Sequence, residues 1–517
     1  MGDIAPLVKD KINVAIAGGG IAGLALAVGL VKQPHVEVRV YESVPQYRDV
    51  GAGLALHLNA IKAMTLIGPE LRGAYFDKAH VMAADQDTEM ATEVILAHGE
   101  SKGTRVAELG RAKGRMSIAR SDLLDGFWSL LPQETVVFGK KLAAIAEKQV
   151  AGEEGHGQRD MVEITFTDGT KAEADVLIGA DGVHSLTRSH LLGADHPATA
   201  PKNHDNWVVY RTMVSMDEAR RCIDEKWCGM GVPILLGPRG HVNIIPLNKG
   251  TRLSAGVAVR GASNPDLVAA PSSEATAGDR EAGAGAEQKK LDPENYDDYT
   301  EEAQKIIRMV ARDTSASWKP ADHDHAPFYA RGPVAMIGDA AHASLPFAGN
   351  GAAQALEDAA VLVALFARLQ ELQHQHNQRL QQQQQQRTSS ANANETSRSS
   401  SAQQDSWDAP AAICTALRAY DVVRRQRSQH VVDLARQFGR VYAYVEDDGR
   451  MHASPERMRA FFADMSSFTN DFDVAGQNRE AVELLDMLLW QDADDDHDIA
   501  VVKDRKRAEK VNGVNGH

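Results

Sequence analysis

The sequence predicts an α/β fold with a second, sheet-rich domain and C-terminal helices. Three observations support this prediction. A strand, a glycine-rich turn, a helix and a second strand follow one another near the N-terminus; two further apolar strands each end at an acid in a turn; and hydrophobicity alternates between residues 203 and 331. Alternation with a period of two is typical of strands that are buried on one face. A chain of 517 residues is long enough for two or more domains.

The composition excludes several classes of protein. The net charge of −15 argues against a nucleic-acid-binding protein, because a surface that binds phosphates needs an excess of basic residues. Three cysteines are too few for a disulfide framework and indicate a reducing compartment. The N-terminus lacks the apolar run of a signal peptide, and no apolar run reaches the roughly 18 residues of a membrane span. We therefore expect a cytoplasmic protein without a membrane span.

The N-terminal unit carries a dinucleotide-binding pattern. An apolar strand over Ile12–Ala17 leads into a G-x-G-x-x-G turn and a helix, and a second strand, Val36–Tyr41, ends at Glu42. The glycines of the pattern are Gly18, Gly20 and Gly23. Glycines at these positions permit a tight turn and let a pyrophosphate approach the helix N-terminus, while an acid about 20 positions later accepts from an adenosine ribose hydroxyl. The unit predicts dinucleotide binding but does not distinguish NAD from FAD.

Two later strands end in a similar way. Residues 174–179 lead into Asp181, and residues 334–337 lead into Asp339, ahead of a helix that opens near Ala352. A helix N-terminus offers free backbone N–H groups and a partial positive charge to an anionic ligand group. An ordinary strand-to-helix turn is the alternative at each position. Three such turns in one chain indicate one extended ligand that is held from several directions.

Two shorter features have two interpretations each. Gly51 and Gly53 suggest a backbone that passes close to a ligand, although a plain turn explains them equally well. Arg120 stands beside a Ser-Asp helix cap, where it either reaches a ligand phosphate or remains a solvated charge at a helix end.

Together these motifs resemble those of the single-component FAD-dependent aromatic hydroxylases, a family that includes 4-hydroxybenzoate and salicylate hydroxylases. The resemblance covers the chain from Lys11 to about Arg440, and Gly51–Leu66 and Arg418–Arg427 look most like the salicylate hydroxylase branch and its fungal relatives. Its further motif residues are Ser185, Arg188, His342, Pro346, Gly349, Gly351, Glu357 and Asp358. It implies a Rossmann-like FAD-binding domain of the 4-hydroxybenzoate hydroxylase type beside a sheet-rich substrate domain.

The resemblance also implies roles for individual residues. Glu42 would hold the adenosine ribose, Asp339 would accept hydrogen bonds from the ribityl hydroxyls, and Arg120 would lie at the phosphate or ribityl chain. The other implied FAD contacts are Gly18, Gly20, Gly23, Gly53, Ala55, Asp181, Gly182, Arg188, Pro346, Gly351 and Ala352. The family associates the motif at Asp181 and Arg188 with the pyridine nucleotide as well. Backbone N–H groups at Gly351 and Ala352 would face the isoalloxazine, where a helix N-terminus stabilises the negative charge of reduced flavin.

The candidate substrate residues lie on two strands of the second domain. Arg211 either holds a carboxylate or phenolate by charge-assisted hydrogen bonds or forms a structural salt bridge. His241 has a side chain suited to act as base toward a phenol hydroxyl, with a packed or exposed histidine as the alternative. Ile245 stands where relatives often carry an aromatic residue, which affects the substrate assignment.

The expected domain organisation is discontinuous. The FAD-binding domain comprises residues 1–200 and 330–370, and the substrate domain comprises residues 201–329 with a disordered insertion at 262–290. Residues 371–409 are rich in Gln and Ser and are expected to form an extended loop. Residues 410–490 are expected to be helical, and residues 491–517 are expected to be a mobile tail.

Two clusters of polar residues are given structural interpretations. Arg424, Arg425 and Arg427 are expected on one solvated helix face with acidic neighbours. The consecutive residues His323–His325 invite a metal interpretation, but they lack a further clustered ligand. No metal site is therefore predicted.

The predicted function is that of a flavin monooxygenase that uses NADH or NADPH. As the resemblance implies, the nicotinamide reduces bound FAD, O2 adds to give a C4a-hydroperoxyflavin, and one oxygen atom passes to a phenolic or salicylate-like aromatic. Such a reaction would serve aromatic catabolism or secondary-metabolite biosynthesis. Two alternatives stay open: a flavin-dependent epoxidase or oxidase acting on a non-aromatic substrate, and a non-catalytic carrier with the same fold. The expected partner is a small aromatic molecule, and the expected assembly is a monomer or homodimer.

Overall fold

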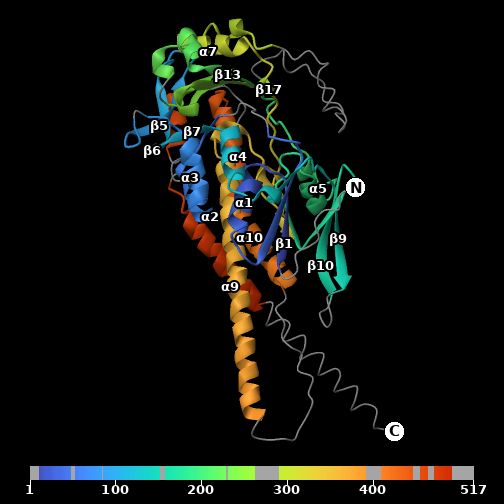
Figure 1. The fold of residues 1–517 in the computed structure, drawn as a ribbon. Helices are drawn as coiled ribbons and strands as arrows, with labels where there is room; N and C mark the ends of the chain where they lie inside the picture. The colour runs from blue at the N-terminus through green and yellow to red at the C-terminus, as the bar shows by residue number, and fades with distance from the viewer. Residues whose placement is uncertain are drawn as a thin grey trace, which may run out of the picture.

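The computed structural model describes residues 11–47, 53–83, 85–151, 158–228, 231–261, 290–391, 409–445, 454–463 and 471–491. Two large sheets dominate this part of the chain, one with mostly parallel pairings and one with mostly antiparallel pairings. In Figure 1 strands β13 and β17 of the second sheet lie at the top of the view, and β1 of the first sheet lies below them. The predicted α/β fold with a sheet-rich second part and C-terminal helices is confirmed.

The first sheet has six strands in the order β18-β19-β12-β1-β2-β8. Their bounds are β1 Ile12–Ala17, β2 Val36–Glu42, β8 Val136–Phe138, β12 Val176–Gly179, β18 Ala330–Arg331 and β19 Val334–Met336. β1 pairs in parallel with β2 and β12, and β12 pairs in parallel with β19. Parallel strands end at the same edge of a sheet. The turns that follow β1, β12 and β19 therefore meet there, although they are far apart in the sequence.

Helices pack against the first sheet and fill the main core. α1 (Ile21–Leu30) is buried along almost its whole length, and it contacts α9 (Gly351–Ala391). α10 (Ala409–Tyr442) in turn packs on α9. The other helices are α2 Leu58–Ile67, α3 Pro69–Lys78, α4 Arg120–Trp128, α5 Leu186–Leu192, α6 Met216–Cys222, α7 Glu301–Ala311, α8 Asp339–His342, α11 Pro455–Phe462 and a helix at 474–491.

α9 is longer than the sequence predicts. Its apolar face ends at Leu369, yet the helix continues to Ala391 through the glutamine run, and in Figure 1 this part projects away from the body of the protein. The loop predicted from residue 371 is therefore wrong as far as residue 391. A Gln-rich segment cannot form a core, but Gln, Leu and Arg are good helix formers. No helix in the described residues has the length and hydropathy that a membrane crossing requires.

The second sheet has seven strands in the order β17-β13-β16-β15-β14-β5-β6. Their bounds are β5 Glu89–Leu96, β6 Arg105–Lys113, β13 Val208–Ser215, β14 Ile234–Gly237, β15 Gly240–Leu247, β16 Arg252–Val259 and β17 Ser317–Trp318. β5 and β6 lie within residues 1–200, which the sequence assigns to the other domain. They join this sheet because β5 pairs with β14, a contact between distant parts of the chain that local sequence does not reveal.

Small sheets connect and extend these two. β3 (Gly53–Ala55), β7 (Met116–Ala119) and β4 (His80–Val81) form one three-stranded sheet, and the hydroxyl of Ser117 donates a hydrogen bond to the carbonyl of Pro246 in the seven-stranded sheet. β9 (Leu142–Ala151), β10 (Gln158–Phe166) and β11 (Lys171–Ala174) form another. The expected insertion at 262–289, residues 392–408 and the tail from 492 lie outside the described residues.

Candidate active site

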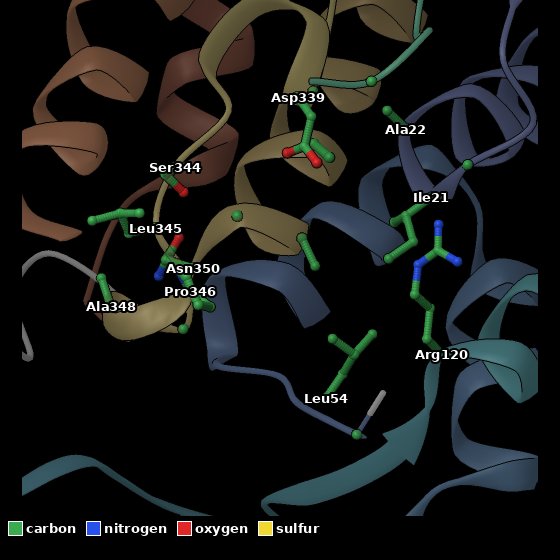
Figure 2. A pocket seen from close by; sticks show the side chains of 18 of the residues that line it. Ile21, Ala22, Leu54, Arg120, Asp339, Ser344, Leu345, Pro346, Ala348 and Asn350 are labelled. Carbon is green, nitrogen blue, oxygen red and sulfur yellow. The ribbon is translucent and has the colours of Figure 1, made fainter. Parts of the chain in front are cut away.

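One cavity of about 850 Å³ lies between the two large sheets. Its walls come from the turns after β1, β12 and β19, from β3 and the start of α4, from the segment 344–352, and from strands of the seven-stranded sheet. Figure 2 shows Asp339, Arg120, Leu54 and Pro346 bordering the same space. Segments that are more than 300 positions apart in the sequence, such as those of Gly18 and Asp339, thus form one site.

The glycine turn after β1 has the backbone shape that the pattern predicts. Gly18 has φ +108°, and a side chain there would collide with the carbonyl of Ala180. A side chain at Gly23 would collide with the carbonyl of Gly18, so Gly23 lets the helix pack closely and does not itself line the cavity. At Gly20 a side chain would point into open space. The start of α1 is therefore uncovered on the cavity side, as an approaching phosphate requires.

Glu42 closes one end of the cavity. Its Oε2 accepts the backbone N–H of Gly19 at 2.6 Å, and its Oε1 accepts the backbone N–H of Val44 at 2.9 Å. These bonds fix the direction of the carboxylate, which keeps further lone pairs for ligand hydroxyls because an ionised carboxylate accepts about four hydrogen bonds.

Asp339 is the least satisfied acid of the site. Its carboxylate is open to the cavity, and within the described residues no side-chain hydrogen bond to it is found. The surrounding protein displaces water from this group and raises the pKa of Asp339, against the lowering effect of nearby His342 and Arg120. In the absence of a ligand the Asp339 side chain is exposed to the cavity and has no hydrogen-bond partner in the described protein. The carboxylate is therefore available to accept hydrogen bonds from a ligand.

Asp181 lines the cavity and also caps α5. Its Oδ2 accepts the backbone N–H groups of Leu186 at 2.8 Å and Thr187 at 3.0 Å, and its Oδ1 accepts the hydroxyl of Ser185 at 2.5 Å. Gly182 follows with φ +77° and also lines the cavity. Burial raises the pKa of Asp181, although these hydrogen bonds act in the opposite direction.

Arg188 lies behind the cavity, in contrast to the predicted contact with the ligand. Its guanidinium is fully buried and donates to the carbonyls of Ala340 at 3.0 Å and Ala341 at 2.7 Å. It is not among the residues that line the cavity. Arg188 therefore supports the short helix α8 that begins at Asp339, because carbonyl groups at the end of that helix need donors.

The start of α9 faces the cavity. Pro346, Gly351 and Ala352 line it as predicted, together with Gly53 and Ala55 of β3 on the other side. The first backbone N–H groups of an α-helix have no partner within the helix. They are available to an acceptor or an anionic group at this end of the ligand.

A buried ion-pair network fixes this region from behind. Arg424 donates from NH1 to Glu357 at 2.6 Å and from Nε to Asp358 at 2.8 Å, and all three side chains are fully buried. Asp358 Oδ2 also accepts from the backbone N–H of Gly338 at 2.8 Å and bonds His342 Nε2 at 2.6 Å. The network thereby ties α10 to both ends of the segment that carries Asp339 and the start of α9.

The predicted solvated arginine face is therefore wrong for two of its three members. Arg424 is buried, and Arg427 pairs with Glu357 at 2.7 Å with a side chain that is 9% exposed. Only Arg425, which pairs with Asp421 one turn away, is partly exposed. Burial alone would raise the pKa of Glu357, but Arg424 and Arg427 lower it below its usual value. Charge patterning along a helix does not reveal acids contributed by a different helix.

Arg211 lies in the wall that the seven-stranded sheet supplies. Its guanidinium stacks over the Trp318 ring with the carbon 4.8 Å from the ring centroid. Burial lowers the pKa of Arg211, and among the described residues it has no carboxylate partner. The salt-bridge alternative is thereby not supported in this part of the chain. An aromatic-stacked guanidinium at a cavity wall is suited to bind a planar anion.

His241 is buried in the same wall. It packs edge-on against Phe347 and Tyr442, with centroid distances of 5.1 Å and 4.9 Å, and its Nδ1 has no hydrogen-bond partner. Burial lowers the pKa of His241 to about 3. The ring is therefore neutral near neutral pH, which makes it a weak proton acceptor and a polar group for orienting a hydroxyl.

Several polar residues of the cavity carry no signal in the sequence motifs, and three of them matter for the shape of the site. They are His57, Arg115 and Asn350. His57 immediately precedes α2, and burial lowers its pKa to about 3. Asn59 is fully buried and bonds Asn350 and Glu357. Arg115 precedes a strand that looks ordinary, so only the structure reveals that it faces the cavity.

The site fits a long, flat ligand with a diphosphate and several hydroxyl groups. The open start of α1 suits the diphosphate, the free Asp339 carboxylate suits hydroxyl donors, and the start of α9 suits an acceptor ring. Among the described residues no group of three or more His, Cys, Asp and Glu side chains is arranged to hold a metal ion.

Comparison with known proteins agrees with this fit. A family model described as an FAD binding domain matches residues 11–398. The 6-methylsalicylate 1-monooxygenase atA of Aspergillus terreus is 32% identical over 486 residues, which span 92% of this chain and 93% of that relative. The chain belongs to the FAD-dependent monooxygenase family.

Two further members of this monooxygenase family show how far the similarity extends. Salicylate hydroxylase of Pseudomonas putida is 32% identical over 371 residues, which span 70% of this chain and 79% of that protein. A solved structure titled salicylate hydroxylase substrate complex superposes with a TM-score of 0.66 at 26% identity, covering 92% of this chain and 98% of that one. FAD is therefore the cofactor of this monooxygenase, and NAD(P)H and O2 are its co-substrates.

Proposed function

We propose that this monooxygenase hydroxylates a phenolic, carboxylated aromatic of the salicylate type. One observation carries the proposal: Arg211, a guanidinium without a protein carboxylate in the described residues, shares one cavity with the FAD-binding segments. A substrate with a carboxylate or ionisable phenol would supply the missing anion. The names of the relatives, 6-methylsalicylate 1-monooxygenase and salicylate hydroxylase, support the same substrate class.

We propose that three turns of the protein contact different parts of FAD. Glu42 would accept from the adenosine ribose, the start of α1 at Gly20 would face the diphosphate, and Asp339 would accept from the ribityl hydroxyls. Arg120, whose charge lowers the pKa of Asp339, would lie beside the ribityl chain or phosphate. Gly351 and Ala352 would offer N–H groups to the pyrimidine end of the flavin, where a helix N-terminus stabilises negative charge.

The chain's own contribution to the reaction is positioning and proton control. Bound FAD supplies hydride acceptance from NAD(P)H and the activation of O2. Arg211 would bind the substrate anion and favour ionisation of a phenol hydroxyl, because a nearby positive charge stabilises the phenolate. His241 would orient that hydroxyl as a neutral ring and not remove its proton outright. Phe347 and Tyr442 would close the apolar wall and exclude water.

A substrate panel tests the proposal. FAD-loaded protein is mixed with NADH or NADPH and with salicylate, 6-methylsalicylate, 4-hydroxybenzoate, phenol or a non-aromatic alkene, and NAD(P)H consumption and oxygenated products are measured. We expect the phenolic acids to stimulate consumption and to gain one oxygen atom. Stimulation by the alkene alone, or consumption without an oxygenated aromatic product, would contradict the proposal.

A further inference from the structure

A second guanidinium, that of Arg115 between β6 and β7, lies against the same wall of the cavity as Arg211. The residue is 4% exposed and lines the cavity. Its Nη1 donates to the carbonyl of Leu109 at 3.2 Å, and its Nη2 donates to the hydroxyl of Thr92 at 3.1 Å. Its Nε has no hydrogen-bond partner. Both partners are neutral, and burial lowers the pKa of Arg115 to about 10.

In the described part of the chain, no acid of this wall compensates the charge. The carboxylates that line the described cavity belong to Glu42, Asp181 and Asp339, which lie at or just after the ends of β2, β12 and β19 in the six-stranded sheet. Removing an isolated ion from water costs several kcal/mol unless a partner of opposite charge is present. The protein therefore holds two guanidinium groups, those of Arg115 and Arg211, on a wall without a carboxylate among its described residues.

The two guanidinium groups lie at opposite ends of this wall. Thr92, which holds Arg115, is on β5, and Arg211 is on β13, four strand spacings away in the sheet order. Four spacings correspond to roughly 19 Å along the sheet. Arg211 stacks on Trp318 of β17, the strand on the far side of β13 from β5. One carboxylate is too small to reach both groups.

The surface between them is continuous and mainly apolar. The register places Arg211 opposite Gly256, Gly256 opposite Asn243, Asn243 opposite Ile234, and Ile234 opposite Val94, which shares its side of β5 with Thr92. All these positions face the same side of the sheet. The apolar side chains that line the cavity along this strip are Val209, Val232, Ile234, Ile245 and Ala258.

We propose that Arg115 is a second acid-binding residue and that the physiological substrate is an elongated aromatic with two acidic groups, one at Arg211 and the other at Arg115. This inference rests on the proposed function, since it extends the same substrate site. The apolar strip would hold the body of the substrate, and burial of that body would contribute affinity in proportion to the apolar area removed from water.

Binding measurements on the FAD-loaded protein test the inference. The probes are biphenyl-4-carboxylate and biphenyl-4,4′-dicarboxylate, two rigid acids that differ only in the second carboxylate, and dissociation constants are taken from the change in flavin absorbance. For the unmodified protein we expect the diacid to bind at least about tenfold more tightly. Equal affinity for the two acids would overturn the inference without any variant.

Variants then assign the effect to Arg115. Arg115→Gln is expected to remove the preference for the diacid and to change monoacid affinity less than about threefold, whereas Arg115→Lys is expected to keep part of the preference. Thr92→Val, which removes one acceptor from Arg115, gives a milder version of the same test. Arg111→Gln, an exposed arginine on β6 paired with Glu108, is the matched control and is expected to change nothing.

The outcomes separate this inference from the proposed function. If FAD affinity falls together with diacid affinity in Arg115→Gln, the residue holds the cofactor and the inference is overturned. If salicylate stimulates NAD(P)H consumption but the diacid shows no advantage, only the second acid-binding role fails. If neither aromatic acid perturbs the flavin and no phenolic acid stimulates consumption, the proposed function fails as well.

Discussion

The wall of the cavity beneath the six-stranded sheet carries charges of both signs, whereas the wall that the seven-stranded sheet supplies carries only positive ones. The first wall contains Glu42, Asp181 and Asp339 together with Arg120. The second contains Arg115 and Arg211 and no carboxylate among its described residues. The first wall is thus suited to a ligand with hydroxyls as well as phosphates, such as FAD, and the second is suited to an acidic substrate.

The two walls also differ in how they are held. Asp339 and the start of α9 are supported by a buried network around Arg424 that satisfies nearly every charge. Arg211 rests on an aromatic ring, and Arg115 is held by two neutral acceptors. The wall at the six-stranded sheet, called the cofactor wall below, therefore has partners for its charged groups without a ligand, except at Asp339. The wall at the seven-stranded sheet, called the substrate wall below, needs a ligand to supply negative charge.

The largest expected effect concerns the support of the cofactor wall. Arg424→Met leaves Glu357 and Asp358 buried without their main partner, and breaking such a pair costs roughly 3–5 kcal/mol. We expect a decrease of that size in the free energy of unfolding, measured by urea denaturation. Arg425→Gln removes a partly exposed pair with Asp421 and should cost less than about 1 kcal/mol. Equal losses in the two variants would show that the network does not support this wall.

The next effect concerns the one unsatisfied acid of the cofactor wall. Asp339→Ala removes the proposed acceptor of the ribityl hydroxyls, and hydrogen bonds to a charged group contribute about 1.5–3 kcal/mol each. We expect FAD affinity to fall by roughly 100-fold in fluorescence titrations. Asp339→Asn, which keeps the shape and one acceptor oxygen, should lose less. A variant that retains stoichiometric FAD through dialysis would contradict the assignment.

A smaller effect is expected on the substrate wall. Arg211→Gln should weaken salicylate binding by about 10- to 30-fold while FAD affinity stays unchanged, because the residue touches the substrate and not the cofactor. Arg239→Gln is the matched control, since Arg239 lies on the same domain, pairs with Asp298 and does not line the cavity. Equal effects of the two substitutions on salicylate binding would indicate that Arg211 has a structural role and does not bind the substrate.

The smallest effect, about 1.4 kcal/mol for each pH unit just below pH 6.5, is a dependence on pH. Burial lowers the pKa of His241 to about 3, below the unfolded value near 6.5, so the unfolded chain binds a proton that the folded chain does not. Stability from this group is present above about pH 6.5 and is lost as pH falls toward 3. His241→Asn should therefore lose stability less steeply on acidification than the parent protein. Parallel slopes of unfolding free energy against pH would contradict a buried, neutral His241.

The cofactor wall could largely be predicted from the sequence, because its residues belong to local motifs. The turns at Gly18, Asp181 and Asp339 follow strands and have local motifs, and the parallel sheet must bring them to one edge. Twelve of the fourteen predicted FAD contacts line the cavity; the exceptions, Gly23 and Arg188, lie behind it. Arg188 matches the family motif, but its guanidinium donates hydrogen bonds to backbone carbonyls, which sequence alone does not reveal.

The substrate wall was less predictable because non-local strand pairing creates it. The guanidinium of Arg115 is held there by Thr92 of β5, and β5 joins β14, more than 130 positions later in the chain. Arg424 shows the same limitation on a helix: its partners Glu357 and Asp358 belong to a different helix, so the local charge pattern suggested exposure. Partner identity across distant segments is a property of the fold and not of the local sequence.

A crystal structure of the protein with FAD and salicylate tests the central claim most directly, namely that one cavity holds FAD on one wall and an aromatic acid on the other. We expect the ribityl hydroxyls within hydrogen-bonding distance of the Asp339 carboxylate, the flavin at Gly351 and Ala352, and the salicylate carboxylate on the guanidinium of Arg211. A flavin bound away from Asp339, or a salicylate carboxylate directed away from Arg211, would contradict the account.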